Sequence, residues 1–224
     1  AKERGAEIRT DSEVARIIVE GGAAVGVTLA DGTTILGEIV VANTDPKRTF
    51  LGLVGEAHLP EDFAADMRTF RMGTASFKIN LALKSLPRLG NAVGSGPDIR
   101  HRLLVNFVES RDAIDHSYRE AAAGRIPDPA TVQMVIPTVF DPSLAPPGQH
   151  VASLACKYFP FDLANGESWD RKREDTADRI LAWVERFVPG LKDLTLGRHV
   201  VSPLDLERTY GLTRADIHHG RLDP

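Results

Sequence analysis

The first part of the chain shows the period-two alternation of apolar and polar residues that is typical of β-strands. We expect short strands at residues 14–19, 25–29, 33–36 and 38–42. Glycine-containing turns separate them, and Asp31-Gly32 is a strong signal for a β-hairpin turn. The last segment, Glu38-Ile-Val-Val-Ala42, is apolar on both faces, which predicts a strand buried within a sheet.

Beyond residue 43, helical and strand patterns follow one another. Asp45-Pro46 has the form of a helix start, with proline at the first helical position, so a helix is expected over residues 47–54. The longest helix is expected from Ser168 to about Val188, because one apolar stripe runs along it. Further helices are expected at residues 60–70, 110–123 and 203–210, and strands at residues 76–83, 103–108, 131–139, 151–158 and 194–201.

This order of elements predicts an α+β fold in two parts. Residues 1–45 are expected to be a small β segment. Residues 46–224 are expected to form a mixed or antiparallel sheet covered by helices. The steady β-α-β alternation of a complete doubly wound domain is missing from the pattern.

The composition is that of a soluble globular protein, with 224 residues of which 42% are hydrophobic and 26% charged. A net charge of -4 gives no strong basic field, which argues against binding to nucleic acid or to an anionic membrane surface. No run approaches the ~18 apolar residues of a transmembrane segment. The single cysteine, Cys156, excludes an intrachain disulfide and fits a reducing, cytoplasmic location. Because Cys156 ends an apolar run, we expect it to be a small buried side chain.

Three tests for site chemistry give no strong signal. The glycines of Gly21-Gly22-Ala-Ala-Val-Gly26 lead into a strand pattern, so a hairpin turn is favoured over a phosphate cradle. Ser95 belongs to no nucleophile elbow and is interpreted as a loop serine. His218 and His219 are adjacent, so one metal ion would not readily bind both, and no metal site is predicted.

Two sets of residues stay open between a surface role and a functional one. Lys78 lies on the polar side of a strand whose other side is apolar, so it is either solvated or lines a pocket that holds a water or an anionic group. His218 and His219 are either solvated loop residues or lie near a substrate. The pattern alone does not decide between these interpretations.

A series of segments along the chain has a characteristic order and spacing. They include Gly5-Ala-Glu-Ile-Arg9, Ile39-Val-Val-Ala-Asn-Thr-Asp-Pro46, Ser76-Phe-Lys-Ile-Asn-Leu81, Ile136-Pro-Thr-Val-Phe-Asp-Pro-Ser-Leu-Ala-Pro-Pro-Gly148 and Ile217-His-His-Gly220. Together they resemble the phytoene desaturase-like flavoproteins of the amine oxidase superfamily. The resemblance covers essentially the whole chain.

This resemblance implies an FAD-dependent oxidoreductase that transfers hydride from a C–H bond of an apolar small-molecule substrate to the flavin. It implies that the backbone of Val14 contacts the adenine end of FAD, and that Ala42 and Asn43 lie where the chain leaves the FAD-binding domain. It also implies that Lys78 lies near the flavin through a water. His218 and His219 match a segment that leads back toward the flavin, and they are candidates for substrate binding.

Members of this family are longer and begin with a GxGxxG fingerprint for FAD, which this sequence lacks. Residues 1–45 are therefore expected to be a β segment of an incomplete FAD-binding domain, and residues 46–224 most of the substrate-binding domain. Such a fragment is expected to be inactive alone, with FAD binding in question. The alternative hypothesis is a non-catalytic module that binds an apolar ligand or a protein, and an exposed domain face would favour a homo-oligomer.

Overall fold

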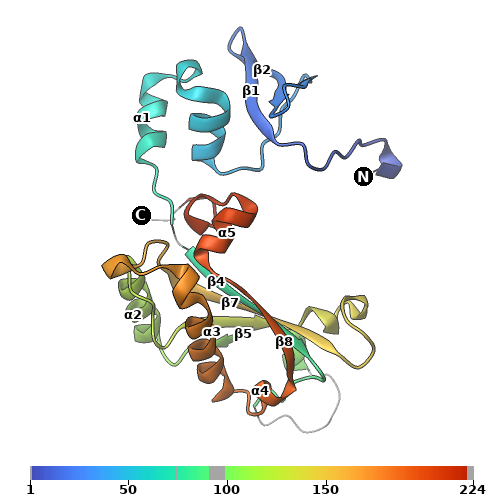
Figure 1. The fold of residues 1–224 in the computed structure, drawn as a ribbon, viewed down its shortest axis with the longest axis vertical. Helices are drawn as coiled ribbons and strands as arrows, with labels where there is room; N and C mark the ends of the chain where they lie inside the picture. The colour runs from blue at the N-terminus through green and yellow to red at the C-terminus, as the bar shows by residue number, and fades with distance from the viewer. Residues whose placement is uncertain (1, 74, 91–98, 221–224) are drawn as a thin grey trace. The chain divides into compact units, whose positions relative to one another are not determined.

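Two separate β-sheets organise the chain, one in residues 1–71 and the other in residues 72–224 (Figure 1). The structure is a computed structural model that describes residues 2–73, 75–90 and 99–220. The helical residues 47–69 belong to the same compact unit as the first sheet. The assignment of residues 1–45 to an FAD-binding domain stays a prediction.

The first unit contains a three-stranded antiparallel sheet in the order β1-β2-β3. Its strands are β1 (Val14–Glu20), β2 (Ala23–Leu29) and β3 (Thr34–Leu36). The Asp31-Gly32 hairpin is confirmed, because Asp31 accepts a hydrogen bond from the Thr33 amide at 2.8 Å and Gly32 adopts φ 87°. Gly26 allows close strand packing, since a Cβ at that position would lie 2.4 Å from the Ile35 carbonyl oxygen.

Helical turns follow the first sheet. They are the π-helix η2 (Lys47–Gly55), the short 3-10 turn η3 (Glu56–His58) and the helix α1 (Glu61–Thr69), and a further 3-10 turn, η1 (Lys2–Arg4), precedes the sheet. The predicted start at Asp45-Pro46 is confirmed, because the Asp45 carboxylate accepts a hydrogen bond from the Arg48 amide at 3.0 Å. Phe50 of η2 packs edge-on against Phe63 of α1, with ring centroids 4.9 Å apart.

The prediction of a buried strand at residues 38–42 is wrong. The last backbone hydrogen bond of the first sheet runs from the Gly37 amide to the Val25 carbonyl, and in residues 2–73 no strand pairs with the segment that follows. As a result, Ile39 is 82% exposed and Val41 is 89% exposed. The apolar pattern predicted burial, but the described part of the chain supplies no neighbouring strand to bury this segment.

The second unit contains a five-stranded antiparallel sheet in the order β5-β6-β7-β4-β8. Its strands are β4 (Ala75–Leu83), β5 (Val105–Phe107), β6 (Thr131–Val135), β7 (His150–Phe159) and β8 (Thr195–Val201). The predicted strand 131–139 ends early. Pro137 has no amide hydrogen to continue the ladder, and residues 137–139 form a 3-10 turn instead.

Helices surround this second sheet. They are α2 (Arg111–Ala122), α3 (Trp169–Glu185), α4 (Leu191–Leu194) and α5 (Pro203–Tyr210). The 3-10 turns are η4 (Ile99–Arg102), η5 (Pro137–Val139), η6 (Pro142–Leu144), η7 (Ala164–Gly166) and η8 (Thr213–Ala215). The combination of helices with antiparallel sheets confirms the predicted α+β fold class. No helix in the described ranges is both long and apolar enough to span a membrane.

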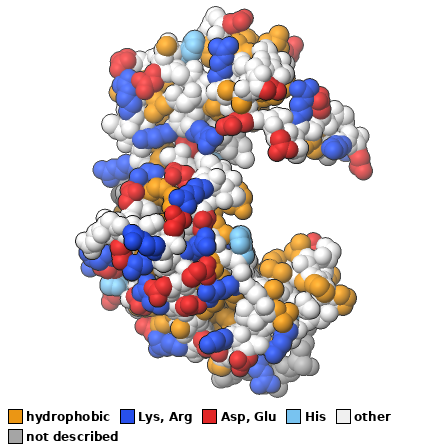
Figure 2. Space-filling view, viewed as in Figure 1, with side chains coloured by type: hydrophobic (Ala, Val, Ile, Leu, Met, Phe, Trp, Pro, Cys, Tyr) orange, Lys and Arg blue, Asp and Glu red, His pale blue; other side chains and the backbone are white. Residues whose placement is uncertain are grey.

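The main core lies between the second sheet and α3, which crosses one face of that sheet (Figure 1). Burial alternates along β4, so Phe77 and Ile79 face the core with no measurable exposure. Phe77 packs against Trp169 of α3 at a centroid distance of 5.6 Å. The predicted burial of Cys156 is confirmed, at 0% exposure, and Trp183 of α3 is 8% exposed. The outer surface is charged instead of apolar, and Figure 2 shows acidic and basic side chains interspersed over α3 and α5.

Candidate functional site

The face of the second sheet that lies opposite α3 carries a group of polar side chains, here called the polar sheet face. Its members come from five strands that the antiparallel register places side by side. They are Lys78, Asn80, Asn106, Thr131, Gln133, Ser153, Lys157 and His199. Because facing residues of neighbouring strands have Cβ atoms about 5 Å apart, their side chains form one continuous surface.

Register fixes two rows on the polar sheet face. Lys78 lies between Ala155 of β7 and Val201 of β8, so its closest cross-strand neighbours are small or apolar. The next row holds Asn80 between Ser153 and His199. The exposed Lys78 ammonium thus lies beside a row of hydrogen-bonding side chains, and Lys157 lies two residues beyond Ala155 on the same face.

Hydrogen bonds between strands order part of this surface. Ser153 Oγ donates to Asn80 Oδ1 at 2.9 Å, and Gln133 Nε2 donates to Asn106 Oδ1 at 2.7 Å. The Lys78 ammonium makes no hydrogen bond or ion pair with any described residue. It is therefore free to hold a water or an anionic group, which is the functional alternative that the sequence left open.

Two helical elements border the polar sheet face. Ser117 of α2 lies 3.4 Å, oxygen to oxygen, from Thr131 of β6. Val201 is buried in a small cluster with Leu206 of α5 and Ala215 of η8. Lys78, Asn106 and His199 remain exposed on this surface, and Asn80 is half-buried.

The turn that carries His218 and His219 is fixed to the start of β4. Asp216 is fully buried, and its two carboxylate oxygens accept the amides of Gly73 at 3.0 Å and of His218 at 2.9 Å. A β-bridge also joins Asp216 to Ala75, three residues before Lys78. The bridge lies about 10 Å along the strand from Lys78. His218, which is exposed, and His219, which is half-buried, follow Asp216 in this turn.

The backbone of this turn is strained. Arg214, Ala215 and His219 adopt left-handed φ angles of 54°, 58° and 58°, which are unfavourable for residues other than glycine. Side chains hold it in place, since Arg214 forms an ion pair with Asp162 at 2.6 Å and its amide donates to Glu207 at 2.7 Å. Strained turns that are held this firmly occur often at functional sites.

A second histidine pair lies at the other end of the sheet. His101 is buried and its Nε2 lies 2.8 Å from the Pro87 carbonyl oxygen. The ring of His150, at the start of β7, lies 3.0 Å from the Thr138 hydroxyl. Burial lowers the pKa of His150, and the charge of His101 lowers it further. In the described ranges, no group of three histidine, cysteine or acidic residues is arranged to bind a metal ion.

The residues predicted to contact FAD lie in the first unit. Val14 begins β1 and is half-buried, whereas Ala42 and Asn43 are exposed in the segment after the sheet. Ala42, together with Ile17 and Phe50, lines a hollow of about 380 Å³ between β1 and η2. These positions remain predicted cofactor contacts.

The described residues do not fit a dinucleotide cradle. Gly21 and Gly22, with φ 58° and 82°, form the turn between two antiparallel strands, and no helix follows them. A cradle for the FAD pyrophosphate needs a strand that leads through glycines into a helix N-terminus. Ser95, interpreted as a loop serine, lies outside the described residues.

Sequence reasoning identified Lys78 but did not group the residues beside it. His199, Ser153 and Gln133 come from strands that are far from Lys78 in sequence, and the register that aligns them is visible only in the fold. The available signal was the alternation on residues 151–158, which places Ser153 and Ala155 on one face.

No family profile matches the chain. Among curated proteins, it is 35% identical over 228 residues to pyridine nucleotide-disulfide oxidoreductase domain-containing protein 2 from Mus musculus, covering 99% of the chain and 39% of that protein. It is 28% identical to the chloroplastic prolycopene isomerase of Daucus carota, covering 90% of the chain and 30% of that protein. It is 23% identical to the lycopene-forming phytoene desaturase of a Paracoccus strain, covering 96% and 40%.

A solved structure shows the same fold. An oxidoreductase from Methanosarcina mazei superposes on 90% of this chain and 39% of its own, with a TM-score of 0.53 and 20% sequence identity. The chain therefore spans about two fifths of the length of the relatives that it matches.

Proposed function

Because this chain is homologous to pyridine nucleotide-disulfide oxidoreductase domain-containing protein 2 and to the phytoene desaturases, we propose that it is the substrate-binding part of an FAD-dependent oxidoreductase. The reaction would be oxidation of a C–H bond of an apolar substrate, with FAD as the electron acceptor. The observation that carries the proposal is 35% identity along 99% of the chain. The shared α+β fold supports it.

The polar sheet face is the surface we assign to the substrate. Besides Lys157 of β7, it carries the ammonium of Lys78, which lies between the side chains of Ala155 and Val201. An apolar substrate can lie against such a strip while Lys78 fixes a water at one point on it. The His218 turn, fixed by Asp216, would border the same surface at the start of β4.

FAD itself would be held mainly by parts of the enzyme that correspond to the remaining length of the relatives. Support comes from the hairpin geometry of Gly21 and Gly22, which offers no pyrophosphate cradle. Val14, Ala42 and Asn43 would add contacts from this chain. Under this proposal the chain alone is inactive.

Flavin binding tests this assignment. The chain and the longest protein that the same gene encodes are purified, and each is titrated with FAD while its visible absorption is recorded. We expect the longer protein to bind FAD stoichiometrically, and the chain alone to bind it weakly or not at all. A longer protein that neither contains nor binds flavin would overturn the proposed function.

The alternative is a non-catalytic module that binds an apolar ligand or a protein. The exposed apolar residues of the first unit favour it, namely Ile8, Leu36, Ile39 and Val41. Analytical ultracentrifugation of the chain across a concentration series addresses this alternative. Self-association that Ile39→Ser and Val41→Ser abolish would support an interaction role for this surface.

A further inference from the structure

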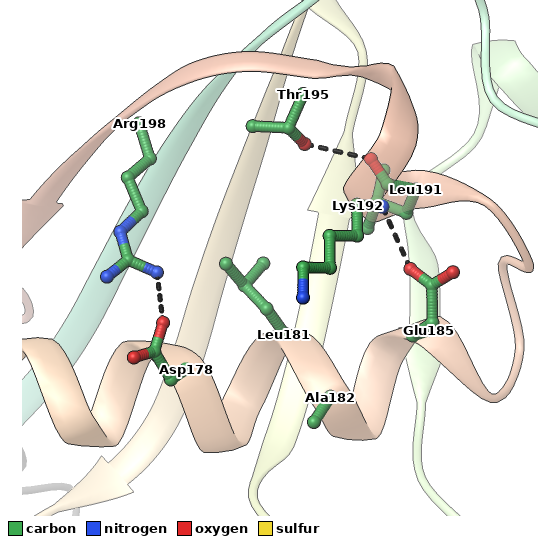
Figure 3. Close-up of a pocket in the computed structure, with 8 residues that line it drawn as sticks. All are labelled: Asp178, Leu181, Ala182, Glu185, Leu191, Lys192, Thr195 and Arg198. Atoms are coloured by element: carbon green, nitrogen blue, oxygen red, sulfur yellow. Dashed lines mark hydrogen bonds and ion pairs between the residues drawn. The ribbon is translucent and has the colours of Figure 1, made fainter.

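A groove separates α3 from α4 and β8 on the side of the second unit that faces away from the polar sheet face (Figure 3). Its volume is about 530 Å³, which lies within the range of small-molecule sites. Leu181 and Ala182 of α3 and Leu191 of α4 give it an apolar floor. The groove lies outside the surface assigned to the oxidised substrate.

Charged side chains line the rim, and most of them are already satisfied by the chain. Glu185 accepts the amides of Gly190 at 2.6 Å and Lys192 at 2.9 Å, so both carboxylate oxygens are used. Asp178 forms an ion pair with Arg198. Arg198 is also paired, at 2.9 Å, with Glu174.

Thr195 is the uncharged polar residue that lines the groove. Its hydroxyl donates to the Leu191 carbonyl at 2.8 Å, which leaves no unused donor hydrogen on that oxygen. Figure 3 shows these bonds closing the two ends of the groove around its apolar floor.

Lys192 differs from the other lining residues. Its ammonium makes no hydrogen bond or ion pair with any residue in the ranges that the structure describes. Figure 3 shows the side chain lying over the groove, with the ammonium pointing toward α3 beside Leu181. A single unpaired cation therefore lies above an apolar floor.

We propose that this groove binds a medium-chain carboxylate, with the alkyl chain on Leu181, Ala182 and Leu191 and the carboxylate on Lys192. The apolar floor favours the alkyl chain because its contact removes apolar surface from water. The carboxylate complements the one cation in the groove that lacks a partner. The proposal does not depend on the proposed redox function.

Octanoate is a suitable probe, with 1-octanol as the uncharged molecule of equal chain length. Calorimetric titration measures affinity, and ¹³C-methyl NMR of the leucines reports where each probe binds. We expect octanoate to shift the methyl signals of Leu181 and Leu191 and to bind at least about tenfold more tightly than octanol, or ~1.4 kcal/mol.

Lys192→Met removes the charge and keeps an unbranched side chain. It should lower octanoate affinity to that of octanol, whereas Lys192→Arg should retain octanoate binding. The matched control is Lys84→Met, an exposed lysine outside the groove, which should change neither affinity. Equal binding of octanoate to the wild type and to Lys192→Met would overturn the proposal, as would methyl shifts confined to other leucines.

Discussion

Cys156 and Lys78 lie on neighbouring strands, β7 and β4, but point to opposite faces of the same sheet. Cys156 faces the core and is fully buried, and this burial raises the pKa of its thiol far above the usual range. Lys78 faces solvent on the polar sheet face. Because successive side chains of a strand point to opposite faces, a shift of one residue determines whether a reactive group faces the core or a ligand in solvent.

Cys156 should be unreactive in the folded protein. A raised pKa keeps the thiol protonated, and only the thiolate attacks a disulfide reagent. We expect no reaction with Ellman's reagent at pH 8 over minutes, and one thiol per chain after denaturation in guanidinium. Rapid labelling of the native protein would contradict the burial of this residue.

Lys78→Met tests the polar sheet face. Since Lys78 is exposed, the substitution should leave the free energy of unfolding within about 0.5 kcal/mol of the wild type. In the flavin-containing protein, we expect the rate of flavin reduction by substrate to fall at least about tenfold, or ~1.4 kcal/mol.

Lys84→Met, just beyond the end of the same strand, is the matched control and should retain the wild-type rate. An unchanged reduction rate in Lys78→Met would remove this residue from the site, even if the flavin assignment itself holds.

Asp216 should be important for stability. Asp216→Ala leaves the amides of Gly73 and His218 without their buried acceptor, so we expect a loss of about 2–4 kcal/mol in urea unfolding. Asp193→Ala, at an exposed acidic residue, should change stability by less than about 0.5 kcal/mol. Similar unfolding curves for the two variants would show that the Asp216 contacts contribute little.

At the scale of elements, the sequence predicted most helices and strands because their patterns are local. The helix from Ser168 and the strand around Lys78 each bury one face, and this periodicity is visible without the fold. Residues 38–42 show the limit, because burial of an apolar segment requires a neighbour that its own pattern cannot reveal.

The candidate site was less predictable than the fold for a related reason. Lys78 could be placed on a polar face from alternation alone. Its relation to Ser153 and His199 depends on the register of three strands. The buried role of Asp216 depends on a single bridge to Ala75 between distant segments. Neither relation leaves a pattern in the local sequence.

The start of α5 gives a pH-dependent prediction. Ser202 Oγ accepts the Asp205 amide at 3.2 Å, and the Asp205 carboxylate accepts the Ser202 amide at 2.9 Å, which forms a capping box. Burial favours a raised pKa for Asp205, but hydrogen bonds from Ser202 and the charge of Arg173 outweigh it, and the pKa is lowered.

A lowered pKa in the folded state means that the ionised carboxylate adds stability at neutral pH. This contribution is lost as the pH falls below about 4. We expect Asp205→Asn to lose less stability than the wild type between pH 6 and pH 3, measured by urea unfolding. Parallel pH profiles would show that the capping box does not couple to ionisation.

At the scale of the whole molecule, the second unit contains its own large core. All members of that core lie within residues 72–224, and both tryptophans are among them. A unit with such a core is expected to fold without the first one.

Residues 72–224 expressed alone should therefore show the tryptophan emission maximum of the full chain and a cooperative urea transition. The reason is that Trp169 and Trp183 are buried by contacts inside this unit. A red-shifted emission maximum or a non-cooperative transition would show that residues 1–71 are needed for this core.

The position of β4 between β7 and β8 has a consequence for synthesis. β4 leaves the ribosome first among the five strands, yet its two neighbours, β7 and β8, are translated last. At ordinary elongation rates, the interval between Lys78 and its partner Val201 is on the order of ten seconds. During that interval both edges of β4, which is apolar on one face, are unpaired, so the nascent chain is a natural client for a holding chaperone.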